Sequence, residues 1–172
     1  FITKDFATPK FYNNPTWGGA IYHQSTYDIT KTLHASIGLR YDYERVGENY
    51  TANKYNLSTG LASNVQTATY KDRMHFSQIT PKFTLSQQIS ANKMVYASIA
   101  RGYKAGGYNV TSTTQKLPAY DPEYNWNYEI GAKLAFLNGT LQTEMSLFYI
   151  AWTHQQVTTT VPGVGNIINN AG

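Results

Sequence analysis

Two segments of the chain alternate apolar and polar residues with a period of two, each over eleven consecutive positions. In residues 33–43 the odd positions hold Leu, Ala, Ile and Tyr, and the even positions hold His, Ser, Gly, Arg and Asp. In residues 126–136 the even positions are apolar and the odd positions are mainly polar. Successive side chains of a β-strand point to opposite faces, so this period predicts long strands with one apolar and one polar face.

Turn-forming residues predict a partner for each of these strands. The dipeptide Asn138-Gly139 favours a type I′ hairpin turn, so the chain is expected to return as a strand over residues 141–157. Apolar residues occur on both faces of that returning strand, and we therefore expect a bulge near Tyr149. The other predicted strands cover residues 17–27, 73–89 and 94–103, and a seventh is expected to begin after Asn169.

The connections between the predicted strands alternate in length. Short turns fall at residues 28–32, 90–93 and 137–140, whereas long polar stretches fall at residues 47–72, 104–125 and 158–170. This asymmetry is typical of transmembrane β-barrels, whose tilted strands need about 9–11 residues to cross the membrane. The predicted fold class is therefore all-β, an antiparallel up-and-down transmembrane β-barrel.

The composition is that of a polar chain with few charged residues. Charged residues make up 14% of the sequence and aromatic residues 15%, with 15 tyrosines. The net charge of +4 is scattered without a basic run, which argues against nucleic-acid binding. The absence of cysteine excludes disulfides, and the longest notable apolar run, residues 147–152, is far below the roughly 20 residues of a membrane-spanning helix.

Aromatic residues gather toward the ends of the predicted strands, as expected of the belts that Tyr and Trp form at membrane interfaces. Tyr27 and Phe136 lie near the short turns. The residues toward the long connections are Trp17, Tyr41, Tyr43, Phe76, Tyr103, Trp126, Tyr128, Tyr149 and Trp152. An aromatic-rich soluble β-sandwich would also alternate, but its strands are typically shorter and its loops less asymmetric.

Several blocks of the sequence resemble the barrel of TonB-dependent outer-membrane receptors. They are SQITPKFTL at 77–85, VYASIARGYKAGGYN at 95–109, Pro122-Glu123, YEIGAK at 128–133, GLRYD at 38–42 and the closing NAG. The blocks look most like the ferric-siderophore receptors of the pesticin-receptor type. This resemblance implies a 22-stranded barrel closed by an N-terminal plug, which imports a scarce nutrient with energy relayed through TonB.

The resemblance also implies where the chain acts and with what. Residues 1–172 would be a partial β-barrel domain of six to seven strands, without the plug domain and the remaining strands. The implied location is the bacterial outer membrane. The implied partners are membrane lipid, a ferric siderophore or similar chelate, and TonB together with the plug through the full-length protein. Cobalamin, another chelate or a glycan are the other cargoes to consider.

Three groups of residues are candidates for a role in the barrel. Most residues of the family blocks are expected to be structural: Arg101, Gly102, Lys104, Gly106, Gly107, Glu123, Tyr128 and Gly131. Arg101 either snorkels toward the outer interface or belongs to the other face of its strand. Glu129 and Lys133 share a polar face and are candidates to line the lumen.

The third group consists of tyrosines in the long connections, where this family carries ligand recognition. Tyrosine rings stack on aromatic ligands or sugars at modest entropic cost, although interface anchoring and loop packing are the alternatives for each residue. The candidate ligand-loop residues are Tyr50, Tyr55, Tyr70, Tyr108, Tyr120 and Tyr124.

No motif predicts catalysis, a metal site or a cofactor. The four histidines, His23, His34, His75 and His154, lack the spacing of a metal site, and no nucleophile elbow, P-loop or dinucleotide fingerprint occurs. The chain is therefore expected not to be an enzyme. Two alternatives to the receptor remain at this point: a soluble tyrosine-rich β-sandwich that binds carbohydrate or protein, and a passive porin-like barrel.

Overall fold

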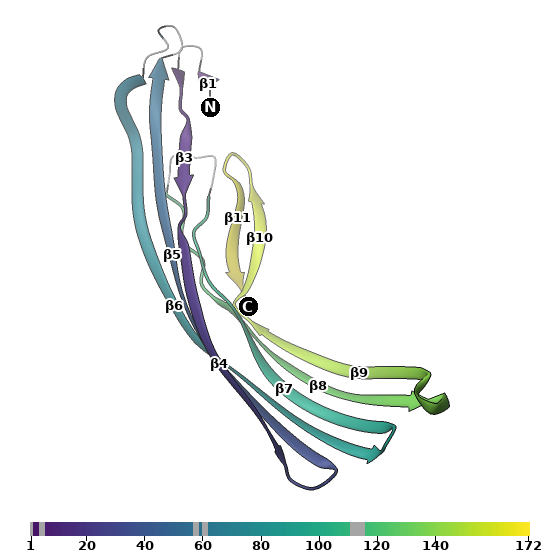
Figure 1. Ribbon diagram of the computed structural model, residues 1–172. Coiled ribbons are helices and arrows are strands. Elements are labelled where there is room, and N and C mark those ends of the chain that lie inside the picture. The colour runs from purple at the N-terminus through teal and green to yellow at the C-terminus, as the bar shows by residue number, and fades with distance from the viewer. Residues whose placement is uncertain (1, 4–5, 57–58, 60–61, 111–115) are drawn as a thin grey trace.

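The computed structural model describes residues 2–3, 6–56, 59, 62–110 and 116–172, apart from the side chains of residues 2, 3, 6 and 62–68. These residues form one nine-stranded antiparallel sheet and a separate two-stranded hairpin (Figure 1). The strands are β1 (Ile2–Thr3), β2 (Phe6–Ala7), β3 (Lys10–Asn13), β4 (Thr16–Asp28), β5 (Leu33–Asn56), β6 (Ala62–Ser90), β7 (Lys93–Lys104), β8 (Glu123–Phe136), β9 (Leu141–Thr153), β10 (Gln155–Val161) and β11 (Gly165–Ala171). No helix in the described part of the chain is long and apolar enough to cross a membrane.

The N-terminal strands form one discontinuous edge of the large sheet. β4 pairs with β5 from Asp28 opposite His34 to Thr16 opposite Val46, and β3 and β2 continue along β5 toward its end. The edge is interrupted at Pro15, whose carbonyl oxygen accepts a hydrogen bond from the Gly47 amide at 2.8 Å. Proline cannot donate to a ladder, so it is tolerated at such a break.

The strand register places the apolar residues of neighbouring strands on one face. Ile37 lies opposite Phe83, Phe83 opposite Ile99, Ile99 opposite Tyr128 and Tyr128 opposite Tyr149. We call this the apolar face, and the opposite side the polar face. Ile37 and Ile130 on the apolar face are 57% and 59% exposed, so no described residue covers them. An uncovered apolar band across five strands is what a sheet with lipid as its outer solvent presents.

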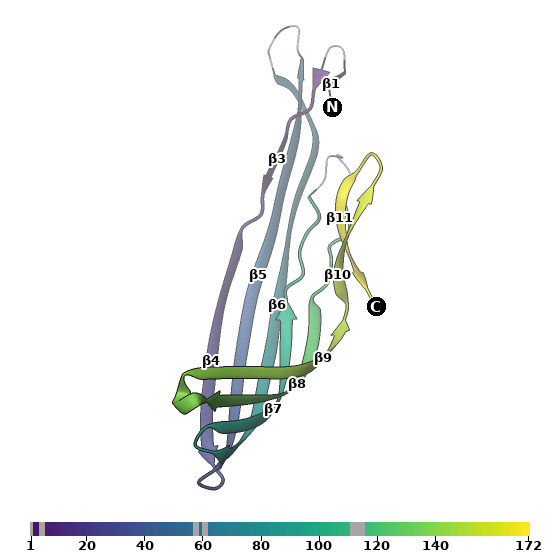
Figure 2. The same cartoon turned by 90° about the vertical axis from the view of Figure 1, so that its right-hand side faces the viewer.

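These observations confirm the predicted all-β antiparallel barrel fold, seen here as a curled sheet (Figures 1 and 2). The soluble β-sandwich is wrong, because a sandwich buries the apolar face of one sheet against a second sheet. The small hairpin of β10 and β11 does not serve as that second sheet. It rises from the end of β9, next to the connection between β7 and β8 (Figure 2).

Two of the expected long loops are instead largely strand. Residues 47–56 and 62–72 continue the β5–β6 ladder far beyond the apolar band, with register shifts only after Ala52. Residues 158–161 and 165–170 belong to the β10–β11 hairpin. Polarity indicated loops at these positions, but a polar sequence pairs equally well wherever both faces of a ribbon meet water or polar protein.

The turn that follows β8 forms as predicted, whereas the bulge predicted near Tyr149 is wrong. Asn138 and Gly139 have φ values of 54° and 89°, and the Thr140 amide donates to the Leu137 carbonyl, as in a type I′ turn. The β8–β9 register runs without a shift from Phe136 opposite Leu141 to Tyr124 opposite Thr153, so no bulge lies near Tyr149. β9 ends before His154, which adopts a φ of 53°.

The mixed apolar pattern of β9 has a different cause. Phe148, Ile150 and Trp152 lie on the polar face of the sheet, opposite Glu129, Asn127 and Asn125. Trp152 therefore does not belong to the aromatic belt of the apolar face. Phe76 alternates with His75 and Ser77, so its ring also lies on the polar face, near Gly106.

The buried residues lie at one end of the sheet. We call the end with residues 29–32, 91–92 and 137–140 the turn end, and the opposite end the loop end. All residues of described burial with less than a tenth of their surface exposed belong to the loop end: Gly47, Glu48, Tyr50, Ala52, Gly106, Gly107, Tyr108, Asn109 and Glu123. Within the part of the chain that the structure describes, a protein core therefore exists only at the loop end.

Candidate functional site

A row of three tyrosines crosses the polar face at the loop end. Tyr12, Tyr50 and Tyr70 are directly opposite one another on β3, β5 and β6. The ring centroids of Tyr12 and Tyr50 are 4.8 Å apart, and those of Tyr50 and Tyr70 are 5.2 Å apart and nearly parallel. Tyr50 is only 2% exposed, and burial together with the two flanking phenols raises the pKa of its hydroxyl. We call these residues the tyrosine row.

A pair of carboxylates lies beside the tyrosine row. Glu48 and Asp72 are opposite each other in the β5–β6 register, two positions from Tyr50 and Tyr70 on the same face. The Lys116 ammonium, from the connection between β7 and β8, contacts Asp72 Oδ2 at 2.6 Å. That ion pair and the hydrogen bond from the Arg73 amide hold the pKa of Asp72 below its usual value. Burial raises the pKa of Glu48, and Lys116 partly offsets this effect.

Polar atoms in this region are buried without a hydrogen bond. Glu48 Oε2, Tyr50 Oη and Tyr108 Oη have no hydrogen-bond partner among the described residues. Glu48 is 4% exposed and Tyr108 is 9% exposed. Such atoms are uncommon in folded proteins because each one loses its hydrogen bonds to water. Chemically, the region offers two phenols and a carboxylate oxygen that are free to bond to a bound molecule.

The connection between β7 and β8 is fixed to the β10–β11 hairpin by amide side chains. Asn109 donates to the carbonyl oxygens of Pro118 and Ile168, and accepts from the Ile168 amide. Asn170 bonds in both directions to the backbone of Asp121, and Gln156 donates to the carbonyl of Ala105. The positions of Tyr108 and Lys116 therefore depend on a hairpin that follows them by some forty residues or more.

Glu123 joins β8 to the start of that hairpin. Its Oε1 accepts from the Trp152 indole N–H at 3.0 Å, and its Oε2 accepts from the Gln156 amide at 2.6 Å. The side chain is buried, with 9% of the residue exposed. Hydrogen bonds to a carboxylate are stronger than those between neutral groups. Glu123 thus holds the chain where β9 ends and β10 begins.

The structure brings together only some of the six predicted ligand-loop tyrosines. Tyr50, Tyr70 and Tyr108 lie around the carboxylate pair. The rings of Tyr50 and Tyr70 stack on each other beside it. Burial raises the pKa of Tyr108, and the nearby charges of Asp72 and Glu48 raise it further. Tyr120 forms an isolated bridge with Gly107. Tyr55 is opposite Ala7 near the end of β5. Tyr124 lies on the apolar face, where it stacks under the Arg101 guanidinium at 4.9 Å.

The predicted lumen residues share the polar face but do not pair with each other. Glu129 accepts a hydrogen bond from the Tyr96 hydroxyl, and Lys133 forms an ion pair of 2.9 Å with Glu144. The Tyr96 ring lies across Gly131, where an added Cβ would come within 2.5 Å of the ring. Each charge is therefore bonded to a neighbouring strand.

The remaining residues of the family blocks lie along β7, at its end and on β8. Arg101 stays on the apolar face, opposite Trp126, so the alternation of β7 is not displaced by one residue. Gly102 and Lys104 belong to the polar face, and Tyr128 to the apolar face. Gly106 allows the chain to pass against the Tyr120 carbonyl, where a Cβ would be 2.3 Å away.

Sequence reasoning missed several residues of this region. Glu48, Asp72, Lys116, Asn109, Gln156 and Asn170 were not among the predicted site residues, and no local motif distinguishes them. The alternation of β5 and β6 could have placed Glu48 and Asp72 on the face of Tyr50, if the strands had been extended through residues 47–72. The described residues contain no group of three or more His, Cys, Asp or Glu side chains able to hold a metal ion.

Comparison with known proteins identifies the family. The model of the TonB-dependent receptor-like β-barrel family matches residues 3–172. The chain is also similar in structure to the ferric yersiniabactin uptake receptor FyuA from Yersinia pestis, with a TM-score of 0.70 and 20% sequence identity. The match covers 98% of this chain and 23% of the FyuA chain, so it reports a shared fold over about a quarter of that receptor.

Barrels of this family are outer-membrane receptors and not a class of enzyme. The family assignment therefore sets aside the passive porin-like barrel. The apolar band, the polar inner face and the alternation of turns and extended hairpins all agree with that assignment. The chain belongs to the TonB-dependent receptor-like β-barrel family.

Proposed function

We propose that this chain is a segment of an outer-membrane receptor that imports a ferric siderophore or a similar chelate. In this proposal residues 1–172 supply part of the barrel wall and the extended hairpin at its outer end. The rest of the barrel, the plug domain and TonB act through the full-length protein. Membrane lipid is the partner of the apolar face. The likeness to a ferric yersiniabactin receptor supports a chelate as the cargo class.

The tyrosine row is the observation that carries the proposal. Tyr50 lies on the polar face, the face of Glu129 and Lys133, at the end opposite the short turns. Cargo that enters a barrel from outside meets this face of this end first. Aromatic rings stack on the planar rings of many chelators, and the Tyr50 hydroxyl, which has no hydrogen-bond partner among the described residues, can donate to a chelator oxygen.

Cargo contact requires the connection around Lys116 to move. Tyr50 and Tyr108 are buried by protein, whereas the Lys116–Asp72 pair is 43% and 45% exposed. Exposed ion pairs contribute little to stability, so the connection is held weakly on this side. A ligand that bonds to Tyr50 Oη, Tyr108 Oη or Glu48 Oε2 supplies hydrogen bonds that these atoms do not make with the described residues.

The test uses the full-length protein and two iron-loaded probes, ferric yersiniabactin and a ferric tricatecholate. A strain without the gene is expected to lose iron-limited uptake of at least one probe. Tyr50→Phe in the purified receptor is expected to weaken binding of that probe by up to about tenfold, the usual value of one hydrogen bond. Tyr27→Phe is the matched control, because Tyr27 is 72% exposed near the turn end.

Two results would count against the proposal. If deletion changes uptake of neither probe and iron does not regulate the gene, the cargo is not a ferric siderophore. If Tyr50→Phe and Tyr27→Phe bind the transported probe equally well, the tyrosine row is a packing element and cargo is recognised elsewhere.

A further inference from the structure

The carboxylate pair beside the tyrosine row places two like charges face to face. Glu48 and Asp72 are directly opposite each other in the β5–β6 register and share the polar face. The Cβ atoms of residues opposite each other on antiparallel strands are about 4.5–5.5 Å apart, and like charges at this spacing destabilise the ladder. The pair therefore requires a cation nearby.

Lys116 supplies that cation from outside the ladder. Its ammonium contacts Asp72 Oδ2 at 2.6 Å. Its charge also acts on Glu48, where it partly offsets the rise in pKa that burial causes. The contact with Asp72 spans 44 residues of sequence, so Lys116 reaches the pair only while the connection between β7 and β8 lies against β6.

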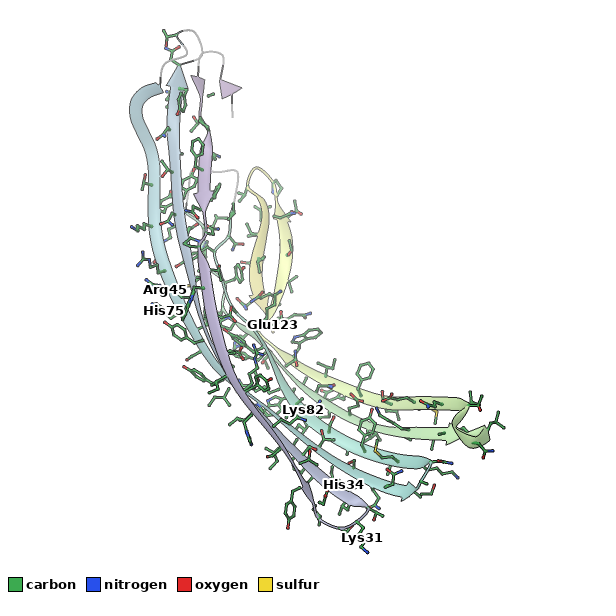
Figure 3. The ribbon with its side chains drawn as sticks, viewed as in Figure 1. Lys31, His34, Arg45, His75, Lys82 and Glu123 are labelled. Atoms are coloured by element: carbon green, nitrogen blue, oxygen red, sulfur yellow. The ribbon has the colours of Figure 1, made fainter. Side chains whose placement is uncertain are left out.

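Basic residues of the strands themselves lie away from the pair. Those at odd positions of β5 and β6 alternate to the opposite face, and Arg45 and His75 are seen on the side of β6 that faces away from Glu123 (Figure 3). Lys10 shares the polar face but is opposite Ala52, on the far side of the tyrosine row. When the connection between β7 and β8 lifts, the two carboxylates lose the ammonium that it carries.

Glu48 keeps an acceptor available even while Lys116 is in place. Its buried Oε2 has no hydrogen-bond partner among the described residues. The buried hydroxyls of Tyr50 and Tyr108 are likewise without a described partner. A carboxylate oxygen bonds most strongly to a charged donor. The region therefore favours a positively charged hydrogen-bond donor between its carboxylates and its phenols.

We propose that the cargo carries an ammonium or a similar cationic donor, which replaces the Lys116 ammonium between Glu48 and Asp72. The proposal rests on the function proposed above and narrows its cargo class to chelates with such a group. An ammonium has three N–H donors, so it can bond to both carboxylates and to a phenol oxygen. An anionic chelate meets two negative charges there, and like-charge contacts of this kind exclude wrong ligands. Lys116 is thus a competitor of the cargo that belongs to the receptor itself.

The test uses the purified full-length receptor and three linear ferric trihydroxamates that differ only at the free end. That end is an ammonium, an acetamide or a succinamate, so the net charge changes while the chelate does not. A ferric tricatecholate is the fourth probe, and dissociation constants are measured by isothermal titration calorimetry. The ammonium probe is expected to bind about tenfold or more tightly than the succinamate probe, since a hydrogen bond between charged groups contributes about that much.

Three variants locate the effect. Glu48→Gln keeps the shape of the side chain without its charge, and it is expected to reduce the preference for the ammonium probe by about tenfold. Lys116→Gln removes the competitor and is expected to bind the ammonium probe more tightly, by up to about fivefold, the value of an exposed ion pair. A merely structural lysine would have the opposite effect. Glu144→Gln, on the polar face near the turn end, is the control and should leave the order of the probes unchanged.

The proposal is overturned if the succinamate probe or the tricatecholate binds as tightly as the ammonium probe, if Lys116→Gln weakens binding of the ammonium probe, or if folded Glu48→Gln keeps the full preference. Should Glu48→Gln not fold, Asp72→Asn at the more exposed member of the pair carries the same expectation. Uptake of ferric yersiniabactin without binding of the ammonium probe would overturn this proposal and leave the chelate receptor standing. A receptor that binds and transports no ferric chelate would overturn both.

Discussion

The first half of β5 and its second half obey the same backbone pairing but are stabilised in different ways. Residues 33–43 present exposed apolar side chains such as Ile37, which no described residue covers. Residues 44–56 carry polar and tyrosine side chains, yet they include Tyr50 and Ala52, which are 2% and 0% exposed. The turn end therefore depends on lipid for its outer solvent, whereas the loop end has a core of its own.

The two regions also separate within the sheet. The β6–β7 ladder ends at Lys82, directly after Pro81, a residue without an N–H to donate. Beyond this point β6 continues with β5 alone and β7 continues with β8 (Figure 1). Opening the sheet here makes room for the connection between β7 and β8 to fold against the polar face of the extended hairpin.

The largest effect is expected for Tyr50→Ala. Removing a buried aromatic side chain costs about 3–5 kcal/mol, and here the loss falls on the loop end alone. Hydrogen exchange of the β5–β6 amides beyond residue 44 should accelerate in lipid vesicles and in detergent alike. Tyr50→Phe should leave the exchange rates unchanged, because the Tyr50 hydroxyl has no hydrogen-bond partner among the described residues. Equal rates in the alanine variant and the unaltered protein would show that the tyrosine row is not a core.

Ile130→Arg should instead destabilise the lipid-facing part of the sheet. An arginine on the lipid side near the membrane midplane costs about 2–4 kcal/mol in a bilayer, and far less where water reaches the face. Denaturant unfolding of the full-length protein in vesicles measures the loss. Thr84→Arg, on the polar face of β6, is the control and should change the unfolding free energy much less. Similar losses for the two variants would contradict the assignment of the faces.

Glu123→Ala should loosen the junction between the two regions. The carboxylate bonds to Trp152 and Gln156, and bonds to a charged group contribute about 1.5–3 kcal/mol. Faster exchange of the Gln156 amide is the expected signal. Glu144→Ala breaks the exposed pair with Lys133 and should cost under about 1 kcal/mol. If Gln156 exchanges at the same rate in both variants, Glu123 does not hold the junction.

The smallest effect concerns pH at the carboxylate pair. Burial raises the pKa of Glu48 above 4.5, so the folded state holds its proton more firmly than the unfolded state. The loop end should therefore lose stability as the pH rises from 4.5 through the raised pKa of Glu48. Asp72, with its pKa lowered by Lys116, acts oppositely and weakens the loop end only below about its ordinary value of 3.8.

Glu48→Gln should remove the part of this dependence that lies above pH 4.5 and make the loop end more stable at neutral pH. The exchange rate of β5 amides, followed from pH 4 to 8 after correction for intrinsic rates, provides the measurement. A variant with an unaltered pH profile would mean that the pKa of Glu48 is the same in the folded and unfolded states.

Much of the membrane-level sheet could be predicted from local sequence. The alternation of 33–43 and 126–136 set the faces of β5 and β8, and Asn138-Gly139 set the turn, because each property arises within one strand or one turn. β9 was harder, because Phe148 and Trp152 lie on the polar face and imitate a bulge. Their placement follows from neighbours on β8 and from Glu123, not from their own hydrophobicity.

The candidate site was less accessible to sequence reasoning. Tyr50, Tyr70 and Tyr108 were predicted as ligand-recognition residues of long loops, whereas Tyr50 and Tyr70 stack across two strands. Their setting depends on Lys116, which contacts Asp72 across 44 residues of sequence, and on Asn109, which contacts Ile168 across 59. Such contacts carry no periodic signal.

By itself the sequence determined which side chains of β5 and β8 lie on the apolar face and where the short hairpins turn, because a strand alternates its side chains whatever surrounds it. Only the tertiary structure decided which polar stretches extend as strands, which tyrosines are buried, and which carboxylates pair with cations. Burial and charge pairing depend on residues that meet through folding over long distances, and those distances are not encoded in any single segment.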